Sequence, residues 1–144
     1  MYATHLETFR ILRPDAGRDV GSPLEMALEL RTGLPVDGLE NVRRETGLPL
    51  GELLAIAGLS ESTVKRRRSS GGRLPTEATD VLYRLLQLFA RARTVLGTVD
   101  AARAWFLAPS RALGHHRPLD LVSSALGGEL LRDELDAIEH GFLA

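Results

Sequence analysis

The sequence predicts an all-α fold, because apolar residues recur at helical spacing and no convincing strand-like alternation appears along the chain. Its 144 residues, 44% hydrophobic and 26% charged, are ordinary for a globular protein and suit one compact domain or two very small ones. Glycine and proline divide the chain into short segments, so we expect roughly seven or eight helices.

Charge and composition exclude several classes of protein. The formal net charge is −1, so nucleic-acid binding would have to come from a local basic patch. The chain has no cysteine, which excludes disulfides, thiolate zinc sites and a cysteine nucleophile and fits a reducing cytoplasm. No apolar run reaches the roughly 18 residues of a membrane span, and the N-terminus lacks a signal-peptide layout. We therefore expect a cytoplasmic protein.

The N-terminal part of the chain is expected to contain little helix. Residues 1 to about 23 are expected to be irregular, because Pro14, Gly17, Gly21 and Pro23 interrupt any helical pattern. The apolar residues that follow predict one short helix around residues 24–30.

The middle of the chain contains three amphipathic segments, each closed by a glycine or a glycine-rich loop. We expect helices over 36–46, 50–57 and 61–68. Ser60 is a good N-cap for the third of them, and Ser69 to Gly72 form the loop that ends it.

The last part of the chain begins with the longest predicted helix, 77–96, which carries a continuous apolar face and stops at Gly97. Three short helices are then expected over 99–107, 118–127 and 129–140. The break between the last two is placed at Gly127-Gly128.

The segment from Leu50 to Lys65 has the spacing of a helix-turn-helix motif. Gly58 opens a tight turn between two short helices. Leu54, Leu59 and Val64 are expected to point inward and fix the angle between these helices. Such a pair holds its second helix at the angle that the DNA major groove requires.

The second helix of this motif carries residues suited to DNA. Between Glu61 and Arg73 five basic residues stand against one acidic residue. Lys and Arg bind phosphates and guanine edges, and Ser and Thr read bases more permissively. The predicted DNA-binding residues are Ser60, Ser62, Thr63, Lys65, Arg66 and Arg67. The alternative is a helical hairpin with a solvated basic face. One such unit reads only a few base pairs, and the usual solution is a homodimer on a palindromic site, which we expect here.

The C-terminal residues have the opposite charge. From Asp120 to Ala144 six acidic residues stand against one basic residue. Such a surface is repelled by DNA, and it suits either a basic partner protein or simple solvation.

Two stretches in this half resemble the C-terminal domain of the Xre/MbcA/ParS antitoxins. They are residues 104–114 (AWFLAPSRALG) and 117–122 (RPLDLV), similar to the family's Trp-Leu, Pro-Asn-x-Ala-Leu-Gly-Gly and Pro-Leu-Asp-Leu pattern. The resemblance extends over about residues 33–144. The chain departs from the pattern at three positions, where Phe106 replaces Leu, Ser110 replaces Asn and His115 replaces a second Gly.

The resemblance implies an antitoxin of a type II toxin–antitoxin system. It implies an N-terminal extension over 1–32, an Xre-like helix-turn-helix domain over 33–75, and a toxin-binding domain over 76–144 that begins with the long helix. The implied partner is a RES-domain toxin that depletes NAD, inhibited by occlusion of its active site. The implied toxin-binding residues are Glu139, His140, Gly141, Phe142, Leu143 and Ala144. The resemblance also implies dimerisation and repression of the protein's own operon at operator DNA.

The sequence offers no support for catalysis, a cofactor or a metal. His115 and His116 are adjacent and lack a third ligand at suitable spacing. Neither a Gly-x-Ser-x-Gly elbow nor a phosphate loop is present. Trp105 is expected to lie in the core rather than at a contact surface. Two alternatives to an antitoxin stay open: a transcription regulator without a toxin, and an interaction module whose helix-turn-helix has decayed.

Overall fold

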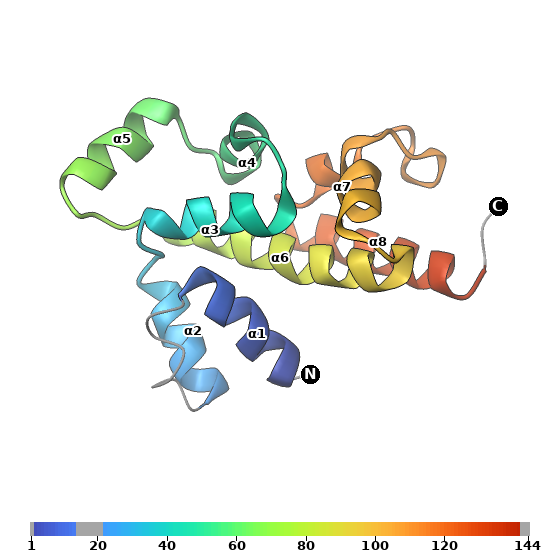
Figure 1. Ribbon diagram of the computed structural model, residues 1–144, viewed down its shortest axis with the longest axis horizontal. Coiled ribbons are helices and arrows are strands. Elements are labelled where there is room, and N and C mark those ends of the chain that lie inside the picture. Colours follow the sequence, from blue (N-terminus) through green and yellow to red (C-terminus); the bar gives the residue numbers. More distant parts are fainter. Residues whose placement is uncertain (1, 14–21, 142–144) are drawn as a thin grey trace. The chain divides into compact units, whose positions relative to one another are not determined.

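The structure, a computed structural model, describes residues 2–13 and 22–141, and within these ranges the protein is helical without any extended strand (Figure 1). The α-helices are α1 (Tyr2–Leu12), α2 (Pro23–Arg31), α3 (Asp37–Thr46), α4 (Leu50–Ala57), α5 (Glu61–Ser69), α6 (Thr76–Leu96), α7 (Val99–Leu107) and α8 (Ala125–Glu139). Two 3₁₀ helices, η1 (Arg111–Leu113) and η2 (Pro118–Leu121), lie between α7 and α8. The predicted all-α fold is confirmed.

The chain forms two compact units, Met1–Tyr83 and Arg84–Ala144, and α6 contributes residues to both. This division falls inside α6, whereas the sequence predicts a boundary at residue 75. The first turns of α6 belong to the first unit because Ala78, Thr79 and Leu82 are buried. Within that unit the Thr79 hydroxyl accepts a hydrogen bond of 3.0 Å from the Leu34 amide.

The expectation that residues 1 to 23 are irregular is wrong for the first of them. Residues 2–12 form α1, which packs on α2 and α3 and buries Phe9 and Leu12 (Figure 1). His5 Nδ1 lies 2.6 Å from the Tyr83 hydroxyl oxygen, which ties α1 to α6 within the first unit. The helix-breaking residues that prompted the expectation begin only at Pro14, after α1 has ended, and residues 14–21 lie outside the described part of the chain.

The predicted break at Gly127-Gly128 is also wrong, because α8 runs through both glycines. A Cβ atom on Gly127 would lie 1.9 Å from the Leu121 carbonyl oxygen, and one on Gly128 would lie 2.7 Å from Arg84 Cδ. These glycines therefore allow close packing rather than a turn. The helix begins instead after Ser124, whose hydroxyl accepts the Gly127 amide at 3.0 Å.

The core of the second unit contains Phe106, Leu119, Leu131 and Leu135, all fully buried. Phe106 stacks on Phe89 with ring centroids 5.6 Å apart. Trp105 meets the edge of Phe106 at 4.9 Å but is only half-buried. The expectation that Trp105 is a core residue is therefore met only in part. Consecutive helical residues point about 100° apart, so Trp105 and Phe106 cannot both face inward.

Candidate functional site

The helix-turn-helix is formed by α4, a tight turn and α5. Gly58 ends α4 in the left-handed conformation, with φ 68° and ψ 31°, where glycine is favoured over residues with a side chain. The Leu59 amide donates to the Leu54 carbonyl at 2.9 Å and closes the turn. Leu54 and Val64 are buried, as predicted, and Leu59 is half-buried.

The first turn of α5 is held by hydroxyl groups. The Ser60 hydroxyl oxygen accepts the Thr63 amide at 3.1 Å and donates to the Thr63 hydroxyl at 2.8 Å. The Ser62 hydroxyl lies 3.2 Å from that of Ser60. Ser60 therefore serves as the N-cap of α5, and Thr63 is half-buried beside it, whereas Ser62 is exposed.

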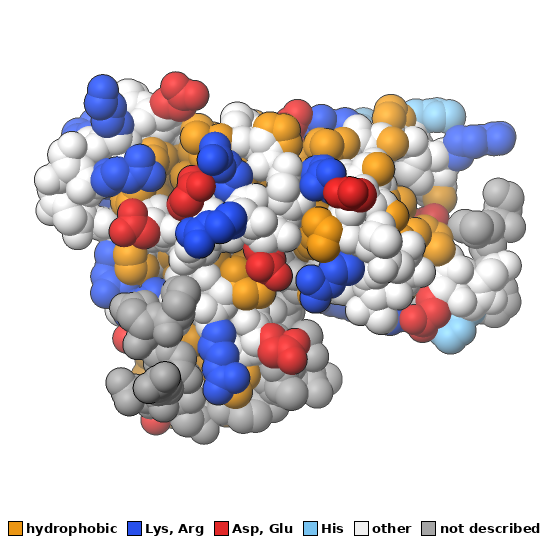
Figure 2. All heavy atoms as spheres, in the orientation of Figure 1, with side chains coloured by type: hydrophobic (Ala, Val, Ile, Leu, Met, Phe, Trp, Pro, Cys, Tyr) orange, Lys and Arg blue, Asp and Glu red, His pale blue; other side chains and the backbone are white. Residues whose placement is uncertain are grey.

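The middle of α5 presents cationic side chains to solvent. Lys65 and Arg66 are exposed, and Val64 is the buried residue between α5 and the rest of the unit. Figure 2 shows basic side chains gathered over α3 and α5, with acidic side chains between them. The structure thus brings five of the predicted DNA-binding residues onto the capped first turns of α5: Ser60, Ser62, Thr63, Lys65 and Arg66.

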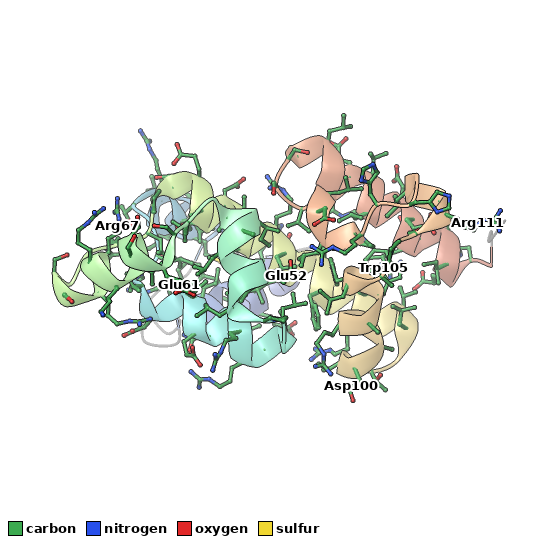
Figure 3. All side chains as sticks on the ribbon, turned by 90° about the horizontal axis from the view of Figure 1, so that it is seen from above. Glu52, Glu61, Arg67, Asp100, Trp105 and Arg111 are labelled. Carbon is green, nitrogen blue, oxygen red and sulfur yellow. The ribbon has the colours of Figure 1, made fainter. Side chains whose placement is uncertain are left out.

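Arg67 differs from the other predicted residues, because its guanidinium turns back onto the protein (Figure 3). Its Nη1 donates to the Arg73 carbonyl at 2.6 Å, and its Nε is buried with no hydrogen-bond partner among the described residues. The Arg67 carbonyl accepts the Gly72 amide at 2.8 Å. Arg73 in turn donates to the Gly33 carbonyl at 2.8 Å. The Arg67 side chain therefore fastens the end of α5 to the following loop.

Arg68 was missed by the sequence analysis, although it is exposed and lies three residues after Lys65 on the same face of α5. Both side chains border a groove of about 400 Å³ between α3, α4 and α5. Its walls are apolar and acidic as well as basic, with Leu39, Glu40, Leu50, Leu54, Glu61 and Val64. The three-residue spacing from Lys65 is the sequence pattern from which Arg68 could have been predicted as a further residue of this face.

The predicted toxin-binding tail is described only as far as Gly141, so Phe142, Leu143 and Ala144 lie outside the described residues. The Glu139 carboxylate is engaged within the chain: Arg91 donates Nη1 to Oε2 and Nη2 to Oε1, each at 2.9 Å. Arg91 also donates to Asp136 at 2.9 Å. The hydrogen bonds from Arg91 lower the pKa of the Glu139 carboxyl. Glu139 thus secures the end of α8, while His140 and Gly141 are exposed.

Two exposed leucines on α8 were not among the predicted site residues. Leu126 is 66% exposed and Leu130 is 47% exposed, and their spacing of four residues places them on one face of the helix. The same helix buries Leu131 and Leu135 on its other side. An i, i+4 leucine pair displaced from the buried stripe was the signal in the sequence.

The loop between α7 and α8 carries His115 and His116, both exposed. His115 has φ 67°, an uncommon value for a residue with a side chain, at the position where the resembled family has a second glycine. Arg117 donates Nε and Nη2 to the two oxygens of Asp120 at 3.0 and 2.8 Å, which lowers the pKa of that carboxyl.

Within the described residues no three His, Cys, Asp or Glu side chains are grouped to hold a metal ion. None of the described helices has both the length and the apolar character needed to cross a membrane.

Two family models match the chain. The model described as the antitoxin Xre-like helix-turn-helix domain matches residues 25–87. The model described as the antitoxin Xre/MbcA/ParS C-terminal toxin-binding domain matches residues 91–141. The two matches follow one another along the chain and correspond closely to its two compact units.

Curated relatives match over most of the chain. The chain is 26% identical over 130 residues to Antitoxin Xre of Yersinia enterocolitica serotype O:8 / biotype 1B, covering 86% of this chain and 87% of the relative. It is 26% identical to Antitoxin Xre of Photorhabdus laumondii subsp. laumondii, covering 80% and 78%. A chain of the crystal structure of the M. tuberculosis MbcT–MbcA toxin–antitoxin complex is similar, with 25% identity and a TM-score of 0.56, over 76% of this chain and 96% of that one.

Proposed function

The chain belongs to the Xre/MbcA/ParS antitoxins, with a helix-turn-helix unit and a C-terminal toxin-binding unit, and on that premise we propose a function for each unit. The first unit binds operator DNA as part of a homodimer and represses the antitoxin's own operon. The second unit neutralises a RES-domain toxin by occluding its NAD-binding active site. The protein acts in the cytoplasm, where operator DNA and NAD are both found, and it catalyses no reaction itself.

The capped and outward-facing α5 is the observation that supports DNA binding. The helix leaves Ser62, Lys65, Arg66 and Arg68 exposed, and only Val64 among its residues is buried. Cations on such a helix neutralise phosphates, and the hydroxyl and guanidinium groups read base edges. The alternative is that α5 is only a solvated basic face of a helical hairpin. That alternative gives no reason for the Gly58 turn, the Ser60 cap and the basic face to occur together.

The apolar surface of the second unit supports toxin binding. Leu126 and Leu130 are exposed on α8, and Trp105 on α7 is half-buried. Tryptophan is enriched among the residues that contribute most to protein interfaces, and exposed apolar side chains that lie together mark interaction sites. We propose that the tail, residues Glu139 to Ala144, enters the opening of the toxin's active site. Because Arg91 occupies the Glu139 carboxylate, the contacts to toxin fall mainly on the residues from His140 onward.

Co-expression with the product of the adjacent gene tests the toxin partner. We expect the two proteins to co-elute in size-exclusion chromatography, and cellular NAD to be restored only when this chain is present. No complex and no effect on NAD would instead favour a stand-alone transcription regulator.

A truncation separates the two surfaces. Removing Phe142 to Ala144 is expected to weaken neutralisation while leaving binding to the DNA upstream of the gene unchanged. A second truncation, which ends inside α8, serves as the control because it shows the effect of general unfolding on both activities. Equal loss of toxin binding and DNA binding in the three-residue truncation would contradict the assignment of separate surfaces.

A further inference from the structure

The two halves of α5 are held in different ways. Val64 is the buried residue of the helix and lies in its first half, close to the turn at Gly58. In the second half Arg66 and Arg68 are exposed and Arg67 is half-buried. The turn and one buried side chain fix where the helix begins, but they leave its far end able to pivot. The direction of α5 therefore depends on contacts at its C-terminal end.

The side-chain contacts at that end pass through Arg73. Arg67 Nη1 donates to the Arg73 carbonyl oxygen at 2.6 Å, and Arg73 Nη1 donates to the Gly33 carbonyl oxygen at 2.8 Å. Arg73 thus accepts one hydrogen bond from α5 and donates another to the segment between α2 and α3. We call these two hydrogen bonds, from Arg67 through Arg73 to Gly33, the Arg73 link.

The segment at the other end of the Arg73 link is itself firmly held. Gly33 and Leu34 are buried. The Leu34 carbonyl accepts the Leu74 amide at 2.7 Å, and the Leu34 amide donates to the buried Thr79 hydroxyl at 3.0 Å. Gly33 has φ 90°, and a Cβ atom there would lie 2.1 Å from the Leu74 carbonyl oxygen. Because the two backbone segments pack this closely, the Arg73 link ends on a fixed support.

The placement of the Arg67 side chain has a cost. Its Nε is buried and has no hydrogen-bond partner among the described residues. A buried donor without a partner is unfavourable, and an exposed guanidinium, such as those of Arg66 and Arg68, avoids that cost. A role in fixing the helix therefore explains the position of Arg67 better than solvation of its charge does.

We propose that Arg73 is a positioning residue, which acts through Arg67 to set the direction of α5 in the major groove of DNA. Side chains that bind a ligand have to be held within about 10–20° of their productive orientation. Hydrogen bonds to base edges carry the sequence information, whereas contacts to phosphates do not. Loss of the Arg73 link therefore lowers the preference for the operator sequence more than the affinity for DNA in general. This inference deepens the proposed function and rests on operator binding.

The competing interpretation is that Arg73, which is exposed, contacts a phosphate directly. Salt dependence separates the two roles. Removal of one phosphate contact lowers the slope of log K against log salt by about one. Removal of a positioning residue changes the preference between sequences and leaves the slope unchanged.

Arg73→Met in the full chain tests the proposal, because it keeps the aliphatic part of the side chain and removes its donors. Binding is measured by fluorescence anisotropy to a duplex of the DNA upstream of the gene and to a shuffled duplex of the same composition. We expect the ratio of the two affinities to fall by about tenfold or more, which is the discrimination of one base contact, with an unchanged salt slope. Arg73→Lys keeps a donor and the charge and is expected to recover part of the ratio. An unchanged ratio in Arg73→Met, or a slope lowered by about one, would overturn the proposal.

Hydrogen exchange of the free protein gives a second readout that needs no DNA. The Gly72 amide bonds to the Arg67 carbonyl and the Leu74 amide to the Leu34 carbonyl, and both are expected to exchange faster in Arg73→Met. Arg68→Met makes the same change at an exposed arginine of α5 and should leave both amides unchanged. Equal exchange rates of these amides in the two variants would contradict the Arg73 link.

Gly33→Ala approaches the Arg73 link from its other end. The added Cβ would meet the Leu74 carbonyl oxygen, so we expect the same loop to be displaced and the affinity ratio to fall. Combined with Arg73→Met it should add little to the larger single effect, because both changes act on one set of contacts. Fully additive effects would show that the two residues act separately and would overturn the link. If circular dichroism shows that Gly33→Ala is unfolded, the comparison of Arg73→Met with Arg73→Lys decides the question alone.

The two readouts also separate this inference from the proposed function. A wild-type chain without preference for the upstream duplex would contradict operator binding, and faster exchange in Arg73→Met would still support the Arg73 link. A wild-type chain that prefers the upstream duplex, with an Arg73→Met variant that keeps the full preference, would contradict the inference alone.

Discussion

The helices α5 and α8 both carry dense charge, but they use it differently. On α5 the cations Lys65, Arg66 and Arg68 are exposed to solvent, and Arg67 alone is drawn back onto the loop. On α8 the acidic side chains Asp136 and Glu139 are held by Arg91 within the same unit. The cations of α5 are thus free to contact an external phosphate backbone, whereas two of the acidic side chains of α8 form ion pairs that hold the end of that helix.

The same two helices also differ in how they are held. Val64 is the one residue of α5 that is buried, whereas α8 buries Gly127, Gly128, Leu131 and Leu135. A substitution can therefore displace α5 without disturbing a large core, whereas a Cβ added at Gly127 of α8 would meet the backbone of Leu121. The following experiments test this contrast, beginning with the largest expected effect.

Gly127→Ala is expected to destabilise the second unit by about 3 kcal/mol, because the new Cβ would meet the backbone of Leu121 rather than a flexible side chain. Urea denaturation followed by the fluorescence of Trp105, the single tryptophan and a residue of this unit, measures the change. Gly51→Ala in α4, where no atom lies within 4 Å of the added Cβ, is the control, and because α4 belongs to the first unit its unfolding is followed by circular dichroism. Equal, small effects of both substitutions would show that α8 is not tightly packed there.

Val64→Ala is expected to destabilise the docking of α5 by roughly 1–2 kcal/mol, through the loss of two buried methyl groups. Hydrogen exchange of the α5 amides should accelerate, and operator affinity should fall with toxin binding unchanged. The exposed Thr94→Ala on α6 serves as the control. Unchanged exchange in α5 would mean that other contacts hold this helix.

Arg66→Ala and Arg67→Ala are expected to separate DNA contact from helix positioning. Loss of one phosphate contact lowers the slope of log K against log salt by about one, and we expect this for Arg66→Ala. Arg67→Ala should weaken operator binding with an unchanged slope, because its guanidinium bonds to Arg73. A reduced slope for Arg67→Ala would place Arg67 on DNA instead.

Arg117→Gln is expected to have the smallest effect, under about 1 kcal/mol, since its ion pair with Asp120 is largely solvated. The pair lowers the pKa of Asp120 below its ordinary value of 3.8. Its contribution to stability is therefore complete above that value and is lost as the pH falls through the lowered pKa. Wild type should lose more stability than Arg117→Gln between about pH 5 and pH 2. Parallel acid curves, measured by Trp105 fluorescence, would contradict this.

Features determined by neighbouring residues could be predicted from the sequence. The Gly58 turn, the Ser60 cap and the helices α2 to α7 all follow from local spacing, and the structure confirms them. The exposed residues of α5 could be predicted for the same reason, since a single buried position at Val64 determines which side faces outward.

Features determined by distant residues could not be predicted in this way. Gly127 has the appearance of a helix breaker until Leu121 is known to pack against it. The α1 helix is stabilised by burial of Phe9 rather than by a strong local pattern. Likewise, the sequence alone does not distinguish Arg67 from the exposed arginines beside it. The difference arises because the following loop brings the Arg73 carbonyl within hydrogen-bonding distance of its guanidinium.

The contact between His5 and Tyr83 has a consequence for synthesis of the chain. The two residues are 78 positions apart, so their hydrogen bond closes nearly all of the first unit into one long loop. The ribosome has to add the first turns of α6, as far as Tyr83, before this bond can form, whereas α4 and α5 depend mainly on nearby residues. The helix α1, although it is synthesised first, therefore forms its contact with α6 late. The second unit can be translated before α1 has packed against the rest of the first unit.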